Sequence, residues 1–256
     1  MARVSYNTPM MAYDHVRDML KDAAGPDGIV SRTDVKKLVR QLRKDGRGSE
    51  AVAARNMFKI IDSRDNAAGA RVTGFDLTAS RRYFKKEMLT DYDLNKNGFS
   101  NAEMQNLSPT MRAMVAAGQM LKVQKAGGRI SHATPEKGMN HIAALITQAA
   151  GPDGIISRDD IKALTRQLYK EGRGTEELAV RYFYNFTDHR DYRAGARVTP
   201  NDIRKAVDYS GTKLLKAKDG NRNGYSKAEY AEFSTTAKAF TLVGKMIEAG
   251  IVKPAN

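Results

Sequence analysis

The sequence contains no cysteine, which excludes disulfide bonds, thiolate metal sites and a cysteine nucleophile. It also lacks an unbroken apolar run, so neither a signal peptide nor a membrane-spanning segment is expected. The glycine-containing phrases GPDG and GRG are not followed by the Lys-Ser or Lys-Thr of a phosphate-binding loop, and there is no nucleophile elbow. We expect a soluble, intracellular, non-enzymatic protein, although secretion without a signal would leave no recognisable mark.

Positive charge, by contrast, is abundant. The chain has 43 lysines and arginines against 29 aspartates and glutamates, a net charge of +14. Such a surface attracts polyanions, so the expected partners are nucleic acid, an anionic membrane surface or an acidic protein. Solubility alone would account for the same excess of charge.

The sequence contains an internal repeat that covers its whole length. Shifting it by 126 residues aligns it with itself without a gap, and 51 of the 126 aligned pairs are identical. The phrase AAGPDGI, for example, occurs at 23–29 and again at 149–155. We infer a tandem duplication, with a first copy at 1–126 and a second copy at 127–256. His15 and His141 are the only histidines that correspond, and both are expected to be structural.

Each copy is predicted to consist of helices joined by short loops. Apolar residues at helical spacing, such as Val35, Leu38, Val39 and Leu42, indicate a helix after the first loop. Other helices are expected over about 10–23, 75–92 and 101–122, and one carries Val52, Met57, Phe58 and Ile61. The strand-like pieces are only two or three residues long. The expected fold class is therefore all-α, with short β-bridges between paired loops.

The last loop of each copy has the composition of a cation site. DLNKNGFSNAE (93–103) and DGNRNGYSKAE (219–229) alternate side-chain oxygens, then place a glycine, an aromatic residue and a glutamate. The glycine permits a sharp turn, and the glutamate on the next helix can close the sphere around a hard cation. The candidate ligands are Asp93, Asn95, Asn97 and Glu103, and Asp219, Asn221, Asn223 and Glu229.

In these residues the chain resembles the EF-hand superfamily, whose loops read D-x-[DN]-x-[DN]-G-x-hydrophobic-x-x-x-E. The loops here are one residue shorter, because the hydrophobic position follows the glycine directly. The resemblance implies a tandem of EF-hand-like helix–loop–helix units and Ca²⁺ as the cofactor, bound weakly or with partial occupancy.

The first loop of each copy, 24–34 and 150–160, resembles the first loop of penta-EF-hand proteins, in which a backbone carbonyl replaces the first acid. That resemblance implies weaker ligands at the Ala24 carbonyl, Asp27, the Ile29 carbonyl and Asp34, and at Ala150, Asp153, Ile155 and Asp160. The alternative is a Pro-Asp-Gly turn that simply reverses the chain.

The middle loops, 65–76 and 191–202, carry alanine, glycine and arginine where oxygen ligands should stand, so metal is not expected there. We expect them to pair with the first loops, Val72 against Val30 and Val198 against Ile156. The third loops would then be left without partners within each copy. One hypothesis is that Phe99-Ser100 pairs with Tyr225-Ser226 and joins the two halves.

Cations recur every three or four residues on the helix that follows each first loop. These residues form a predicted basic ridge for an anionic partner: Lys36, Arg40, Lys44 and Arg47, and Lys162, Arg166, Lys170 and Arg173. The alternative is an ordinary solvated helix face. The expected function is calcium-responsive or calcium-stabilised binding of an anionic partner. The alternatives are a metal-free scaffold of the same fold or a basic nucleic-acid-binding protein.

Overall fold

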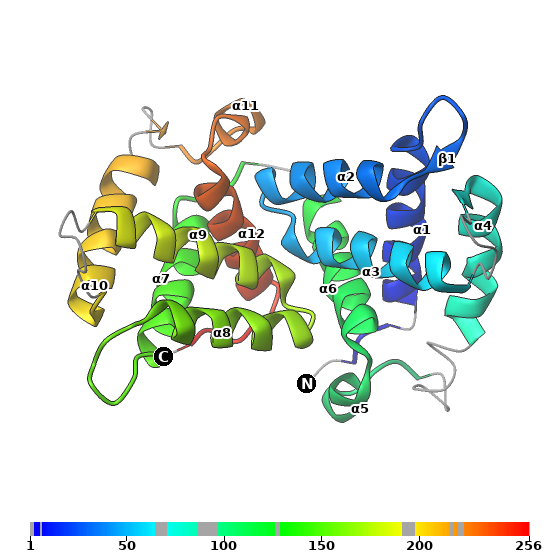
Figure 1. Cartoon of the computed structure of the whole chain (residues 1–256). Coiled ribbons are helices and arrows are strands. Elements are labelled where there is room, and N and C mark those ends of the chain that lie inside the picture. The colour runs from blue at the N-terminus through cyan, green and yellow to red at the C-terminus, as the bar shows by residue number, and fades with distance from the viewer. Residues whose placement is uncertain are drawn as a thin grey trace. The chain divides into compact units, whose positions relative to one another are not determined.

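The structure is a computed structural model that describes residues 3–5, 7–64, 71–86, 97–125, 129–190, 198–215, 218–219 and 223–255. Within these ranges the chain is mostly helical, in agreement with the expected all-α class (Figure 1). None of the helices in this part of the chain is both long enough and apolar enough to cross a bilayer.

The chain divides into two compact units. Unit 1 consists of Met1–Arg43, Ser49–Leu121 and Lys170–Gly174, and unit 2 of Lys44–Gly48, Lys122–Tyr169 and Thr175–Asn256. The units follow the two halves of the sequence except at 44–48 and 170–174. Each of these segments is counted with the unit formed mainly by the other half.

The helices of the second half repeat the bounds of the first. The first half contains α1 (Asn7–Asp22), α2 (Arg32–Lys44), α3 (Gly48–Arg64), α4 (Gly74–Tyr83), α5 (Asn101–Asn106) and α6 (Pro109–Lys125). The second contains α7 (Ala133–Gln148), α8 (Arg158–Lys170), α9 (Gly174–Arg190), α10 (Pro200–Tyr209), a π-helical turn at Ser210–Leu215, α11 (Lys227–Ala231) and α12 (Thr235–Glu248). The bounds of α7 to α10 lie 126 residues after those of α1 to α4.

The helix expected over 101–122 is in fact two helices, α5 and α6. Pro109 is the first residue of α6, and proline disfavours helical backbone at the residue before it, so α5 cannot continue. The hydroxyl of Ser108 then accepts a hydrogen bond from the Met111 amide at 3.3 Å. Similarly, the helix expected over 75–92 is α-helical only to Tyr83, and residues 87–92 lie outside the described ranges.

Short β-pairs connect the loops. In unit 1, β1 (Ile29–Val30) pairs antiparallel with β2 (Val72–Thr73), which places Val30 opposite Val72 as expected. In unit 2, Ile156 forms a bridge with Val198, also as expected.

The hypothesis that the third loops pair with each other is wrong. Phe99 forms its bridge with Val4, and Tyr225 forms its bridge with Ile130. The segment ahead of the first helix of each half supplies these partners, and each bridge has two amide–carbonyl hydrogen bonds of 2.8–2.9 Å. The backbone amide and carbonyl groups of Phe99 and Tyr225 are therefore satisfied within their own units.

Two glycines allow α7 and α12 to pack very closely in unit 2. A Cβ atom at Gly244 would lie 1.8 Å from the Thr134 carbonyl oxygen, and one at Gly138 would lie 2.0 Å from that of Phe240. Both distances are far below van der Waals contact. The core around this contact includes the buried side chains of Ile142, Ile146, Phe183, Phe240 and Val243.

In unit 1 the core surrounds α1, where Tyr13, Val16 and Leu20 are buried. The Tyr13 hydroxyl donates a hydrogen bond to the Leu77 carbonyl oxygen at 2.6 Å and so connects α1 to α4. Burial raises the pKa of Tyr13 to about 12, so the phenol stays protonated and can act as a donor over the whole physiological range.

Candidate functional site

In the third loop of unit 1, an arginine side chain binds Glu103, one of the predicted calcium ligands, together with a backbone carbonyl of the loop. The Arg3 guanidinium donates from Nε to the Gly98 carbonyl oxygen and from Nη2 to Glu103 Oε2, both at 2.9 Å. Glu103 Oε2 also accepts from the Ser100 amide at 2.7 Å, as part of a capping box that begins α5. The Glu103 carboxylate is thus bound by the positively charged Arg3 side chain.

The third loop of unit 2 repeats this arrangement. Arg129 Nη2 lies 3.0 Å from the Gly224 carbonyl oxygen and 3.4 Å from Glu229 Oε2. The Ser226 amide donates to the same glutamate oxygen at 2.7 Å and begins α11. These hydrogen bonds favour the charged carboxylate. Ser226, first through its amide, holds the pKa of Glu229 below its ordinary value, and Ser100, first through its side chain, holds the pKa of Glu103 below its own.

Asp219 is the one aspartate of the third loops that the structure describes, and its carboxylate is directed into the loop. Its side chain is buried, and it accepts hydrogen bonds from the Gly224 amide at 2.7 Å and the Asn223 amide at 3.3 Å. His132 Nε2 lies 2.6 Å from Asp219 Oδ2, although the two atoms lack the alignment of a hydrogen bond. The aspartate therefore shapes the turn and lies against the His132 imidazole.

The described groups of the third loops do not fit a divalent cation in this arrangement. Calcium requires about six to eight oxygen ligands, usually with a bidentate glutamate, and both glutamates here are engaged by a serine amide and an arginine. Over the described ranges, no three His, Cys, Asp or Glu side chains converge on one point. Asp93, Asn95 and Asn221, which were predicted as ligands, lie outside those ranges.

The first loops form turns that are closed by their own hydrogen bonds. The Gly25 amide donates to the Ile29 carbonyl oxygen at 3.1 Å, and Asp27 accepts from the Ile29 amide at 3.0 Å. Asp34 is occupied by Ser31, whose hydroxyl donates to its carboxylate at 2.6 Å and, as the leading cause, lowers its pKa.

The second copy of the first loop repeats these contacts. Gly151 bonds to Ile155 at 2.9 Å, Asp153 accepts from the Ile155 amide at 3.0 Å, and Ser157 donates its hydroxyl to Asp160 at 2.6 Å. The geometry is that of the Pro-Asp-Gly turn that was the alternative to a metal site.

The two corresponding histidines pair with buried glutamates. His141 Nε2 lies 2.7 Å from Glu176 Oε1, and its Nδ1 accepts a hydrogen bond from the Ala255 amide at 2.8 Å. His15 lies 3.0 Å from Glu50 in the same way. Both ring nitrogens of His141 are engaged, and the glutamates are fully buried, which favours the structural role expected for these residues.

The predicted basic ridges are exposed along the helices but not at their last members. Lys36, Arg40 and Lys44 are exposed on α2, as are the matching Lys162, Arg166 and Lys170 on α8. Arg47 and Arg173 follow the helix ends and are half-buried, and Arg173 forms an ion pair with Glu171 at 2.9 Å. The three helical positions of each ridge, and not the fourth, can therefore meet a partner freely.

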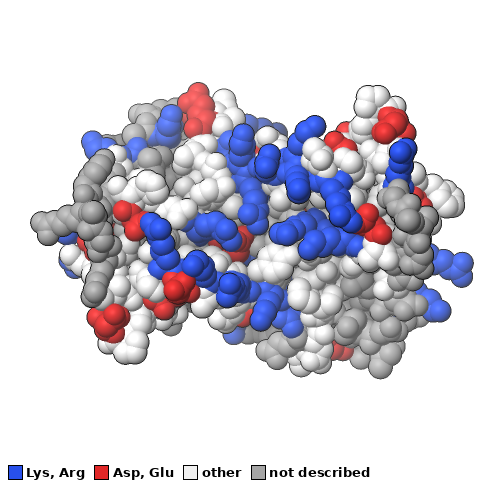
Figure 2. Space-filling view, viewed as in Figure 1, with Lys and Arg blue, Asp and Glu red and all other residues white. Residues whose placement is uncertain are grey.

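Helix α3 adds two cations that sequence reasoning missed. Arg32 at the start of α2 pairs with Asp62 near the end of α3 at 2.9 Å, so the two helices run antiparallel. For two antiparallel helices that meet at this pair, helical geometry places Lys36 near the level of Lys59 and Arg40 near the level of Arg55. All four are exposed. We call these residues (Lys36, Arg40, Arg55 and Lys59) the α2–α3 basic face, and Figure 2 shows lysine and arginine gathered over these helices.

The matching surface of the second copy is partly neutralised. Lys162 pairs with Asp159 at 2.8 Å, and Arg181 pairs with Glu177. The first copy has Thr33 and Ala51 in place of these two acids, and Lys59 corresponds to Asn185. No ion pair to any member of the α2–α3 basic face is found among the described residues, so the first copy presents the stronger positive field.

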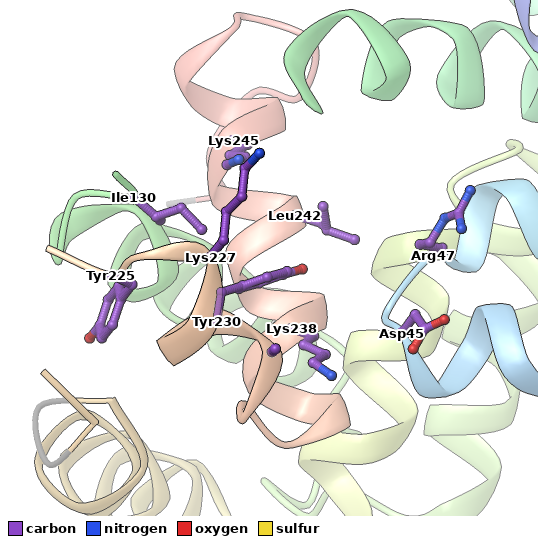
Figure 3. A pocket seen from close by; sticks show the side chains of 10 residues that line it. Asp45, Arg47, Ile130, Tyr225, Lys227, Tyr230, Lys238, Leu242 and Lys245 are labelled. Carbon is purple, nitrogen blue, oxygen red and sulfur yellow. The ribbon is translucent and has the colours of Figure 1, made fainter. Parts of the chain in front are cut away.

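Unit 2 also contains a pocket of about 490 Å³. Lys227, Tyr230 and Ala231 line it from α11, Lys238, Leu242 and Lys245 from α12, and Asp45, Arg47, Ile130 and Tyr225 from the remaining segments (Figure 3). Four of the lining residues are cations and one is an acid. The spacing of Lys238, Leu242 and Lys245 along one helix face was readable in the sequence, but only the folded chain brings α11 against it. No protein-family model, curated protein or solved structure matches this chain.

Proposed function

We propose that the chain is a non-enzymatic, EF-hand-like binding protein whose α2–α3 basic face binds the phosphate backbone of nucleic acid. The observation that carries this proposal is the set of four exposed cations on two antiparallel helices, without an acidic partner among the described residues. The loops between the helices serve to hold these faces in place, as the metal-free reading of the sequence implies.

The composition of the face favours nucleic acid over a membrane. A helix that lies in a membrane surface inserts large apolar side chains beside its basic ones. The large hydrophobic side chains that are exposed in the described ranges are Phe75 and Tyr209, and neither lies on α2 or α3. Binding to phosphates requires no apolar insertion, because the release of counterions supplies the free energy.

The side chains exposed on α2 and α3 also favour a duplex over a single strand. Single-stranded nucleic acid is usually bound by stacking its bases on aromatic side chains. The exposed positions of α2 and α3 carry no aromatic residue. Two rows of cations, spaced about 6 Å along each helix and about 8–10 Å between helix axes, instead offer a rigid grid for phosphates. We therefore expect binding that is independent of base sequence.

Fluorescence anisotropy with a labelled 20-base-pair DNA duplex tests the proposal. The variant Lys36→Gln/Arg40→Gln/Arg55→Gln/Lys59→Gln removes the α2–α3 basic face. The control Lys162→Gln/Arg166→Gln/Lys205→Gln/Lys253→Gln removes four exposed cations elsewhere, so both variants fall to the same net charge. At 50 mM salt we expect the first variant to weaken binding at least tenfold and the control to change it less than threefold.

Equal losses in the two variants would show that binding follows net charge and not this face. Binding of poly-glutamate or phosphatidylserine vesicles in preference to the duplex, lost in the first variant only, would keep the face as an anion-binding surface and reject nucleic acid. Absence of binding to all three probes would reject the proposed function.

Calcium-responsive binding stays a prediction of the EF-hand resemblance. Calorimetric titration with Ca²⁺ tests it, with Glu103→Gln/Glu229→Gln as the comparison. Heat that disappears in the double variant would assign calcium to the third loops. No heat in the parent protein would leave the loops as structural elements.

A further inference from the structure

The pocket in unit 2 combines positive charge with apolar and aromatic surface. Its volume of about 490 Å³ lies within the range of small-molecule sites, about 300–1,000 Å³. Arg47, Lys227, Lys238 and Lys245 line it, with Asp45 as the only acid. Because cations outnumber the acid four to one, the lining favours a ligand with two or more negative charges.

The two lysines from α12 stand on the face of a helix that is otherwise mostly buried. Lys238, Leu242 and Lys245 are spaced by four and three residues, so they share one stripe of α12. Both lysines are half-buried, and the structure records no ion pair for either among the described residues. Burial lowers the pKa of Lys245 because desolvation disfavours the charged ammonium, and the nearby Glu248 carboxylate offsets part of this effect. A bound anion would stabilise the charged form.

Tyr230 and Leu242 supply the apolar part of the lining. In Figure 3, Lys227 and Tyr230 come from α11, whereas Leu242 and the other two lysines come from α12. The Tyr230 ring packs against the buried Phe233, with 5.6 Å between ring centroids. A flat ring can stack on a phenol or an aliphatic side chain, while phosphates bind the surrounding lysines.

This combination belongs to the second copy alone. At the matching positions of the first copy, Asn101 stands for Lys227, Met104 for Tyr230 and Gln119 for Lys245. The first copy thus lacks two of the cations and the aromatic ring, although the surrounding helices repeat. The charge and the aromatic ring at these three positions are therefore features of the second copy and are not required by the repeated fold.

We propose that this pocket binds a small phosphate ester that carries a planar ring, of the nucleoside diphosphate class. The lysines hold the phosphates, and Tyr230 with Leu242 contacts the ring. The site is separate from the α2–α3 basic face and does not depend on the function proposed for that face.

Isothermal titration calorimetry with ADP, adenosine and pyrophosphate tests the site. ADP should bind at least tenfold more tightly than either fragment, since it uses both parts of the lining. Lys227→Gln/Lys245→Gln should weaken ADP at least tenfold, and Tyr230→Leu should weaken ADP but not pyrophosphate. The control Lys205→Gln/Lys253→Gln removes two exposed lysines from the same unit and should change ADP affinity less than twofold.

The variant Lys227→Arg/Lys245→Arg keeps the charge and should bind ADP within about threefold of the parent, which separates loss of the site from loss of folding. The proposal would be overturned by pyrophosphate binding as tightly as ADP, by equal losses in the pocket and control variants, or by no heat with ADP.

Discussion

At the scale of single residues, the acids of the loops act as helix caps. Glu103, Glu229, Asp34 and Asp160 each accept hydrogen bonds from the serine three positions earlier. Because EF-hand ligands and capping-box residues both lie at the start of a helix, the same sequence pattern serves either role. The surroundings decide between them, and here Arg3 and Arg129 supply the positive charge.

Removing the hydroxyl of one capping serine tests this role. Ser226→Ala deletes the group that accepts from the Glu229 amide at 3.2 Å. Loss of such a cap costs about 1 kcal/mol of stability, so the urea midpoint should fall accordingly. Ser226→Thr keeps the oxygen and should stay close to the parent. An alanine variant as stable as the parent would contradict the capping role.

The same carboxylates predict a pH dependence. The folded pKa values of Glu103 and Glu229 lie below the ordinary value of 4.5, so the folded state binds fewer protons than the unfolded state in that window. Their contribution is fully present above about pH 4.5 and is lost as pH falls through the folded values. Glu103→Gln/Glu229→Gln should therefore lose less stability than the parent between pH 6 and pH 3, measured by urea unfolding. Identical losses would reject this contribution.

At the scale of elements, the spacing of apolar residues in helices and the residues typical of turns predict most of the fold. The α2 stripe, the Pro-Asp-Gly turns and the Val30–Val72 pairing were all predictable, because they depend on local periodicity and on loops close in sequence. The pairing of Phe99 with Val4 was not, because no local signal favours that partner over Tyr225. The break at Ser108-Pro109 was readable and was missed.

The α2–α3 basic face was also only partly predictable from the sequence, because part of it has no local signal. Lys36 and Arg40 repeat on one helix and were predicted, whereas Arg55 and Lys59 lie on α3 and carry no helical rhythm of charge. Their position beside the α2 cations is inferred from the antiparallel arrangement of the two helices, which the Arg32–Asp62 ion pair indicates. The pocket needed tertiary contacts for the same reason, since α11 and α12 line it together.

Helix packing in unit 2 gives a prediction at this scale. Gly244→Ala would place a methyl group 1.8 Å from the Thr134 carbonyl oxygen, so α12 must move away from α7. Overpacking of this kind costs about 1–3 kcal/mol or more, and the melting temperature should drop by several degrees. Gly211→Ala is the control, because its new Cβ would meet Met139 Cε at 3.6 Å, an ordinary contact. Equal effects of the two substitutions would contradict the close approach.

At the scale of the whole molecule, the two copies keep the same helices but differ in surface charge. The second copy places Asp159 and Glu177 beside its cations, whereas the first copy has none there. The first copy thus carries the α2–α3 basic face, for which phosphate binding is proposed, and the second copy supplies most of the lining of the cationic pocket. Since neither site uses the loop carboxylates, duplex binding should be unchanged within twofold between 1 mM CaCl₂ and 1 mM EGTA, measured by anisotropy. A larger change would link the loops to binding.

The salt dependence of duplex binding tests the central claim most directly. The association constant falls with salt, and each phosphate contact adds about 0.9 to the magnitude of the slope of log K against log salt. Removing the four cations of the α2–α3 basic face should therefore lower this magnitude by about 3 to 4. The matched control variant should keep the slope of the parent. A slope that is the same in the parent and in the Lys36→Gln/Arg40→Gln/Arg55→Gln/Lys59→Gln variant would contradict the account.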